Sequence, residues 1–264
     1  MSIWALIPAK DPALAKSRLA PRVPAAARHD FSIYALQRVL RALASTPKIA
    51  GRLVISNGEQ PLAVARQYGA VPIMESQRPD NDPRQTEPQE GTERSLDGLN
   101  AAVQRGAMEA LQRGATAVLV IAGDLPLADA ASLTSLVTAL PDGPGLVIVP
   151  DRHGGGTNAL LVQPPDLIPF AFGEGSFQRH LRMANEHQVP AVVLNLPNLA
   201  HDVDTPEDLE ALEALLARQR RHVDMDRTEE RAPANAHAEE VELRWLFNSL
   251  VGHDTHYEAT CQRR

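Results

Sequence analysis

Short apolar runs alternate along this chain with longer stretches in which apolar residues recur at helical spacing. Such runs are typical of buried strands, and the spaced pattern is typical of amphipathic helices. We expect strands at 3–8, 53–55, 71–74, 117–122, 145–149, 159–162 and 192–196, and helices at 25–45, 62–68, 94–113, 133–140, 176–186 and 205–218. This alternation predicts βαβ units, and therefore an α/β fold in which helices sandwich a mostly parallel sheet.

Carboxylates follow two of the predicted strands. Parallel sheets bind ligands outside the carboxyl ends of their strands, so these positions are candidates for a site. Asp124 follows a strongly apolar run, and Asp202 and Asp204 follow the last predicted strand. Together they would form an oxygen-rich site for a hard cation such as Mg²⁺. The alternative is structural: Asp124 begins a turn with Pro126, and Asp204 or Thr205 caps the next helix.

Three cations follow the first predicted strand within residues 10–18, namely Lys10, Lys16 and Arg18. A triphosphate needs local positive charge of this kind. A solvated surface loop is the alternative interpretation. The segment is not a P-loop, because it has no glycines and lacks the GxxxxGK[ST] spacing.

Two glycine-rich segments also follow predicted strands. In the first, the glycines at 154–156 would let the backbone approach a ligand, and Thr157 offers a hydrogen bond. In the second, Gly173 precedes Ser176, which we expect to be the N-cap of a helix with N–H groups suited to an anion. Each segment alone is a weak turn signal, but together they predict a second, anionic substrate.

These segments together resemble the CofC/FbiD family, the 2-phospho-L-lactate or phosphoenolpyruvate guanylyltransferases of coenzyme F-420 biosynthesis. The matching stretches are IPAK at 7–10, AKSRL at 15–19, AGDLP at 122–126, PDR at 150–152, GTNAL at 156–160, FGEGSF at 172–177 and DVDTP at 202–206. The GTNAL and FGEGSF pair is the most specific. The resemblance implies a nucleotide-diphospho-sugar-transferase-like (GT-A/Rossmann-like) fold, GTP as substrate and Mg²⁺ as cofactor.

The resemblance also implies roles for single residues. The metal ligands would be Asp124, Asp202 and Asp204. The contacts to the small acid would be Thr157, Gly173 and Ser176. The nucleotide-binding cations, which would also assist catalysis, would be Lys10, Lys16 and Arg18. Asn100 and Glu75 are further candidates for binding the guanine base.

The predicted reaction transfers GMP from GTP to the phosphate of phosphoenolpyruvate or 2-phospho-L-lactate and releases pyrophosphate, in deazaflavin coenzyme biosynthesis. One alternative is another nucleotidyltransferase of the same fold that acts on molybdopterin or a sugar phosphate. The other is a non-catalytic GTP-binding protein, which would bind GTP without turnover. A pyrophosphate-release assay separates these alternatives.

The composition limits which binding partners and which cellular compartment we expect for this protein. A net charge of −7 argues against nucleic-acid binding, and no apolar run approaches the ~20 residues of a membrane span. With one cysteine, Cys261, and no basic region at the N-terminus, we expect a cytoplasmic protein. We expect a catalytic domain at 1–221, a mobile or inserted loop at 77–93 and a polar, flexible extension at 222–264. A second copy of the chain, or a downstream enzyme of the pathway, is a candidate partner.

Overall fold

The structure, a computed structural model, describes residues 1–75 and 93–226, with the backbone alone at 93–97 and 217–226. The strands are β1 (Ile3–Pro8), β2 (Ile49–Ser56), β3 (Val71–Met74), β4 (Ala117–Ile121), β5 (Gly145–Pro150), β6 (Thr157–Gln163) and β7 (Ala191–Val193). The helices are α1 (Ala25–Ala44), α2 (Glu59–Gln67), α3 (Glu93–Gln112), α4 (Ala130–Thr138), α5 (Ser176–Glu186), α6 (Pro197–Ala200) and α7 (Pro206–Asp226), with a 3-10 turn, η1 (Ser17–Leu19). Each predicted strand and helix is present. The predicted loop at 77–93, except its last residue, and the extension beyond Asp226 lie outside the described residues.

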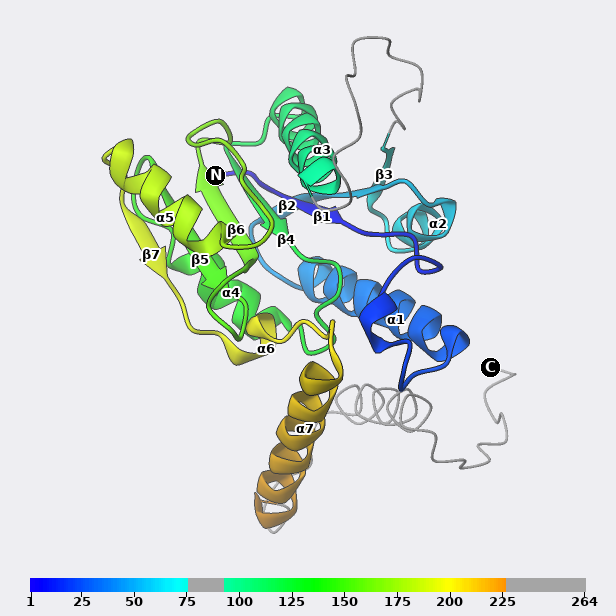
Figure 1. The fold of residues 1–264 in the computed structure, drawn as a ribbon. Coiled ribbons are helices and arrows are strands. Elements are labelled where there is room, and N and C mark those ends of the chain that lie inside the picture. The colour runs from blue at the N-terminus through cyan, green and yellow to red at the C-terminus, as the bar shows by residue number, and fades with distance from the viewer. Residues whose placement is uncertain (76–92, 227–264) are drawn as a thin grey trace, which may run out of the picture.

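The strands form a 7-stranded sheet in the order β3-β2-β1-β4-β6-β5-β7 (Figure 1). All neighbouring pairs are parallel except those of β6, which runs antiparallel to both β4 and β5. The first residue of β6, Thr157, therefore lies beside Pro150, the last residue of β5. Thus the start of β6 reaches the edge at which the parallel strands end, which we call the carboxyl edge.

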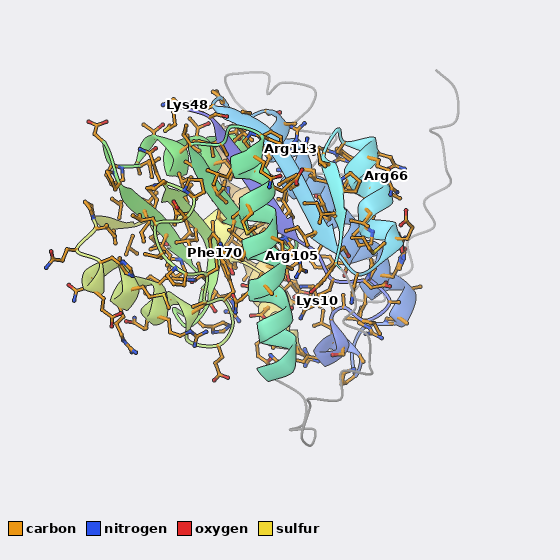
Figure 2. All side chains as sticks on the ribbon, turned by 90° about the horizontal axis from the view of Figure 1, so that it is seen from above. Lys10, Lys48, Arg66, Arg105, Arg113 and Phe170 are labelled. Carbon is orange, nitrogen blue, oxygen red and sulfur yellow. The ribbon has the colours of Figure 1, made fainter. Side chains whose placement is uncertain are left out.

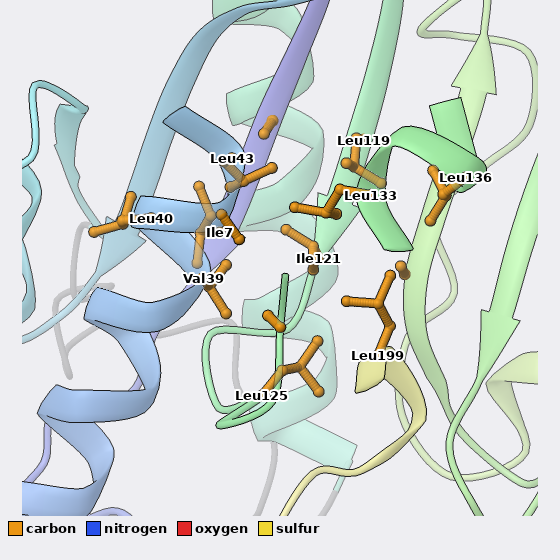
Figure 3. Close-up of a cluster of buried hydrophobic side chains, with 14 of the residues drawn as sticks. Ile7, Val39, Leu40, Leu43, Leu119, Ile121, Leu125, Leu133, Leu136 and Leu199 are labelled. Carbon is orange, nitrogen blue, oxygen red and sulfur yellow. The ribbon is translucent and has the colours of Figure 1, made fainter. Parts of the chain in front are cut away.

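Helices cover both faces of the sheet, as predicted (Figure 1). Side chains of α1, α2, α4 and α6 pack on one face, and those of α3 and α5 pack on the other. The alternation of β4 explains this, since Leu119 and Ile121 join the first core and Val118 and Val120 the second. Figure 3 shows the first core, where Leu43 of α1 and Leu133 of α4 meet at the sheet.

A third apolar cluster ties the beginning of the chain to α7. It contains Leu19, Val23, Phe31, Tyr34, Leu127, Val203, Leu209 and Leu212. From this cluster α7 runs away from the sheet (Figure 1) to Asp226. The expected domain boundary after Arg221 therefore falls inside this helix. Within the described residues, no helix is long and apolar enough to cross a membrane.

Two lysines in Figure 2 mark the two ends of the parallel strands. Lys48 precedes β2, and Lys10 follows β1. Lys10 therefore marks the carboxyl edge, where the candidate residues gather.

Candidate functional site

A buried lysine joins two carboxylates at the carboxyl edge. The Nζ of Lys16 lies 2.6 Å from Oδ2 of Asp124 and 2.9 Å from Oδ1 of Asp204. Asp124 follows β4 and Lys16 follows the adjacent parallel strand β1, while Asp204 directly precedes the α7 region. Lys16 has a left-handed backbone with φ 58°, which is uncommon outside glycine and clusters at functional sites. The structure thus brings a predicted nucleotide-binding cation between two predicted metal ligands.

The charges of this cluster stabilise one another. Burial by itself would lower the pKa of Lys16, but the charges of Asp124 and Asp204 outweigh burial and raise that pKa above its ordinary value. Burial would raise the pKa of Asp124, but the Lys16 ammonium lowers it, and Lys10 adds to this effect. Lys10 is exposed beside the cluster, and Arg18 is exposed on η1, two residues after Lys16. Both ions of the Lys16–Asp124 pair are therefore charged at neutral pH.

The third carboxylate, Asp202, has no cation bonded to it in the described residues. Its Oδ1 accepts a hydrogen bond of 3.1 Å from Nδ2 of Asn158, which also donates to the carbonyl of Leu199. Burial, together with the negative charges of Asp124 and Asp204, raises the pKa of Asp202 to about 6. The three predicted metal ligands are therefore close enough to repel one another.

The three carboxylates suit a hard cation, but their oxygens do not point toward one common position. Among the described residues, no three His, Cys, Asp or Glu side chains form a ready-made metal site. Asp124 and Asp204 turn toward Lys16, and Asp202 turns toward Asn158. Three carboxylates and one buried lysine leave an excess of negative charge, and all-oxygen ligands are what Mg²⁺ prefers. The side chains of Asp124, Asp202 and Asp204 therefore have the chemistry that Mg²⁺ binding requires.

Helix α7 begins with a reciprocal cap that leaves Asp204 free for Lys16. The carboxylate of Asp208 accepts from the backbone N–H groups of Asp204 and Thr205, while the Thr205 hydroxyl accepts from the N–H of Asp208. This is the capping-box pattern, with Thr205 as the cap. Of the two predicted caps, Thr205 is therefore the right one. Sequence reasoning missed that Arg152 also pairs with Asp208, at 2.6 Å.

The predicted acid-binding residues meet beside the carboxylates. Oγ of Ser176, at the start of α5, lies 3.1 Å from Oγ1 of Thr157, at the start of β6. The carbonyl of Gly173, three residues before Ser176, accepts from the N–H of Ser176. Oγ1 of Thr157 also lies 3.1 Å from Nδ1 of His180, a fully buried side chain to which sequence reasoning assigned no role. Its spacing of four from Ser176, which puts both on one helix face, is the signal that could have found it.

The prediction that Ser176 is the N-cap of α5 is wrong. Gly175 is the cap, with a left-handed backbone at φ 70°, and Ser176 is the first helical residue. A positive φ strains any residue with a Cβ, so the glycine makes this turn possible. The Ser176 hydroxyl is consequently free to turn toward Thr157 instead of capping the helix.

The glycines before Thr157 close a turn around a carboxylate. Asp151, after β5, accepts hydrogen bonds from the N–H groups of His153, Gly155 and Gly156. A Cβ on Gly156 would come within 2.7 Å of Oδ2 of Asp151, so a side chain here would displace that carboxylate from its hydrogen bonds. The N–H groups of Gly155 and Gly156 are thus bonded to Asp151, and this turn leads into Thr157 at the start of β6. Approach of a ligand to this backbone stays a prediction.

Asn100 supports the loop that carries Gly173. Its Oδ1 accepts from the N–H of Phe172 at 2.7 Å, and its Nδ2 donates to the Phe172 carbonyl at 3.2 Å. Arg179 holds the same loop through the carbonyls of Ala171, Phe172 and Glu174. The other guanine candidate, Glu75, follows β3 and donates its N–H to the carbonyl of Ser56 at the carboxyl edge. Contact of Asn100 or Glu75 with the nucleotide stays a prediction.

Residues 3–222 match the protein family described as "Guanylyl transferase CofC like". The chain belongs to this family. The chain is similar to a phosphoenolpyruvate guanylyltransferase of Rubrobacter xylanophilus, which is 39% identical over 81% of this chain and 95% of its own length. A 3-phospho-D-glycerate guanylyltransferase of Colwellia psychrerythraea is 30% identical over 80% of this chain and 90% of its own. The predicted family and the predicted enzyme class, a nucleotidyltransferase, are confirmed.

Solved structures confirm the predicted fold. A putative nucleotide-diphospho-sugar transferase of Desulfovibrio desulfuricans superposes with a TM-score of 0.62 at 16% identity, covering 94% of this chain and 98% of that one. A nucleotidyl transferase of Methanothermobacter thermautotrophicus has a TM-score of 0.54 at 17% identity, covering 83% and 99%. At such identities the likeness concerns the fold alone.

Proposed function

We propose that this CofC-like nucleotidyltransferase transfers GMP from GTP to the phosphate of phosphoenolpyruvate, or of the closely related 2-phospho-L-lactate. The observation that carries the proposal is its similarity, over 80–83% of this chain, to enzymes named phosphoenolpyruvate guanylyltransferase. The relative named for 3-phospho-D-glycerate is less similar, so that acid is the second candidate. The product would enter the biosynthesis of coenzyme F-420, and the enzyme would act in the cytoplasm.

The proposed reaction needs no general base on the protein. An oxygen of the acid's phosphate attacks the α-phosphorus of GTP, a new P–O–P bond forms, and the bond to the leaving pyrophosphate breaks. A phosphate monoester carries between one and two negative charges at pH 7, so the attacking oxygen is already ionised. What the protein must supply is positive charge and orientation for two anions.

The cations of the carboxyl edge supply that charge. Lys10 and Arg18 are exposed on either side of the buried Lys16, where they can reach the triphosphate. Mg²⁺ held by Asp124, Asp202 and Asp204 would add charge neutralisation and assist departure of the pyrophosphate.

The acid would lie against β6 and α5. The hydroxyl groups of Thr157 and Ser176 lie together, and Gly173 bends the loop beside them with φ 119°. A carboxylate accepts hydrogen bonds only, so a pair of hydroxyl donors suits it. With its carboxylate at Thr157 and Ser176, the acid can direct its phosphate toward the aspartate cluster.

A pyrophosphate-release assay tests the proposal. Phosphoenolpyruvate, 2-phospho-L-lactate, 3-phosphoglycerate, a sugar phosphate and molybdopterin are each combined with each nucleoside triphosphate, with Mg²⁺ present. We expect release with GTP and a three-carbon phosphoacid, and its loss in Asp124→Asn, which keeps the side-chain shape but removes one charge. Turnover with another acceptor, or GTP binding without turnover in the wild type, would contradict the proposal.

A further inference from the structure

The fully buried His180 of α5 plays no part in the proposed chemistry, yet its ring bridges the two segments of the acid subsite. Its Nδ1 lies 3.1 Å from Oγ1 of Thr157 on β6, and its Nε2 lies 3.1 Å from the backbone N of Ala171 in the loop before α5. The ring of Phe172 packs against it edge-on, with 5.0 Å between centroids. Both ring nitrogens are therefore engaged and neither faces water.

We propose that His180 is a positioning residue that makes the hydroxyl pair of Thr157 and Ser176 a hydrogen-bond donor toward an anionic oxygen of the substrate. This inference rests on the proposed function, because it concerns the subsite for the small acid. It goes further in naming what prepares that subsite for a carboxylate.

The backbone selects the tautomer of His180. The N–H of Ala171 can only donate, so Nε2 of His180 must be the unprotonated, accepting nitrogen. The proton of the neutral ring then lies on Nδ1, which donates to Oγ1 of Thr157. Burial and the neighbouring Arg179 lower the pKa of His180 to about 4, so the ring is neutral under physiological conditions.

Counting protons gives the consequence for the hydroxyl pair. Thr157 and Ser176 together carry two hydroxyl protons, and one of these forms the bond of 3.1 Å between their oxygens. His180 fills an acceptor position of Thr157 with a proton of its own, so the second hydroxyl proton is not used inside the group. Whichever hydroxyl donates to the other, one O–H is left for a ligand. In the opposite tautomer, the unprotonated Nδ1 would accept a hydrogen bond from that O–H, and none would be left for a ligand.

This polarity favours a carboxylate over a ligand that donates. An ionised carboxylate has only acceptor oxygens, so it fits a subsite whose free group is an O–H. The same ring holds the loop of Gly173 through Ala171, so one side chain fixes both the direction of the hydroxyls and the distance between the two segments.

Two substitutions separate the two hydrogen bonds of the ring. His180→Asn places an amide N–H near the former Nδ1 and so retains a donor to Thr157. His180→Gln reaches the former Nε2 and so retains an acceptor for Ala171, but it removes the donor to Thr157. We expect the KM for the acid to rise about tenfold in His180→Gln and less than about threefold in His180→Asn, with the KM for GTP near the wild-type value in both. His187→Gln, an exposed position at the end of the same helix, is the matched control.

A double-mutant cycle tests whether His180 acts through Thr157. In Thr157→Val, which lacks the hydroxyl, we expect His180→Gln to raise the KM for the acid no further. Independent effects of the two changes would overturn the proposal, as would equal increases in His180→Asn and His180→Gln.

Nitrogen NMR of the histidine-labelled wild-type chain reads the tautomer without any turnover. A proton on Nδ1 of His180 supports the proposal, and a proton on Nε2 overturns it. If no acid is guanylylated by the wild type, the proposed function fails, while this measurement still decides the hydrogen-bond assignment.

Discussion

The ammonium group of Lys16 lies 2.6 Å from a carboxylate oxygen of Asp124, although 108 residues separate them in the chain. The side chain of Lys16 is only 3% exposed, so this pair is shielded on the lysine side. Because the same ammonium also contacts Asp204, one cation holds together the ends of two segments. The candidate site therefore also contributes to the stability of the fold, and this contribution can be measured separately from the activity.

Lys16→Met should lower the free energy of unfolding of the metal-free protein by roughly 2–4 kcal/mol, because two neighbouring carboxylates lose their counter-charge. Urea unfolding followed by circular dichroism measures this. The control Lys10→Met removes an exposed cation of the same cluster and should shift the unfolding midpoint much less. We expect MgCl₂ to restore part of the stability of Lys16→Met. Equal midpoints for the two variants would contradict the assigned role of Lys16.

Asp202→Asn should stabilise the metal-free protein at pH 7.5 while it lowers guanylyl transfer. Burial and two neighbouring carboxylates raise the pKa of Asp202 to about 6, so its ionisation opposes folding above that pH. We expect a gain of about 1–3 kcal/mol at pH 7.5 that shrinks as the pH falls from 6 to 4, where the wild-type group becomes neutral. Thermal unfolding of both proteins across this range provides the test. A less stable variant at pH 7.5 would show that Asp202 is not repelled by its neighbours.

Asp208→Asn should destabilise the start of α7 by about 2–3 kcal/mol, since this carboxylate completes the cap and pairs with Arg152. Burial would raise the pKa of Asp208, but its hydrogen bonds with Thr205, Arg152 and His153 outweigh burial and hold it well below the ordinary value. Its contribution is thus present above about pH 4 and is lost as the pH falls below that value. The control is Glu210→Gln, which breaks the exposed ion pair between Glu210 of α7 and Arg22. Its unfolding midpoint should match the wild type. A midpoint shift as large in Glu210→Gln would refute the assignment.

The stability of the wild type should depend on pH through His180. In the folded chain the pKa of His180 is about 4, below its ordinary 6.5, so the unfolded chain binds the proton first as the pH falls. The stabilisation is complete above pH 6.5 and is lost between 6.5 and 4. Between pH 7.5 and 4.5 we expect the wild type to lose roughly 2 kcal/mol more than His180→Gln. Urea titrations at both pH values measure this, and His187→Gln should behave like the wild type. Parallel losses in all three proteins would rule out a buried neutral imidazole.

Much of the fold could be predicted from the hydrophobic pattern. The bounds of β1, β3 and α5 agree with the prediction to the residue. The direction of β6 could not be predicted, since a short apolar run looks the same in either orientation. That reversal is what places Thr157 at the carboxyl edge.

Asp124 and Lys16 could also be predicted, because they follow β4 and β1, two adjacent apolar strands that end at the same edge. Asp202 and Asp204 instead follow the short helix α6, which the sequence did not predict. Other contacts around the site could not be predicted. The pairing of Arg152 with Asp208 and the contact of His180 with Thr157 join residues that lie 56 and 23 positions apart, and no sequence pattern relates those segments. Gly175, and not Ser176, is the cap because its left-handed backbone at φ 70° makes the turn, which leaves the serine hydroxyl for Thr157.

The packing of Leu209 and Leu212 against Leu19 has a consequence for how this protein is made. During translation, the whole sheet through β7 leaves the ribosome before Asp202, Asp204 and α7 do. A nascent chain at that stage has Lys16 and Asp124 but lacks the remaining carboxylates and the helix that packs on the turn after Lys16. Because α7 is synthesised after every strand of the described sheet, these residues of the site come together only once α7 has left the ribosome.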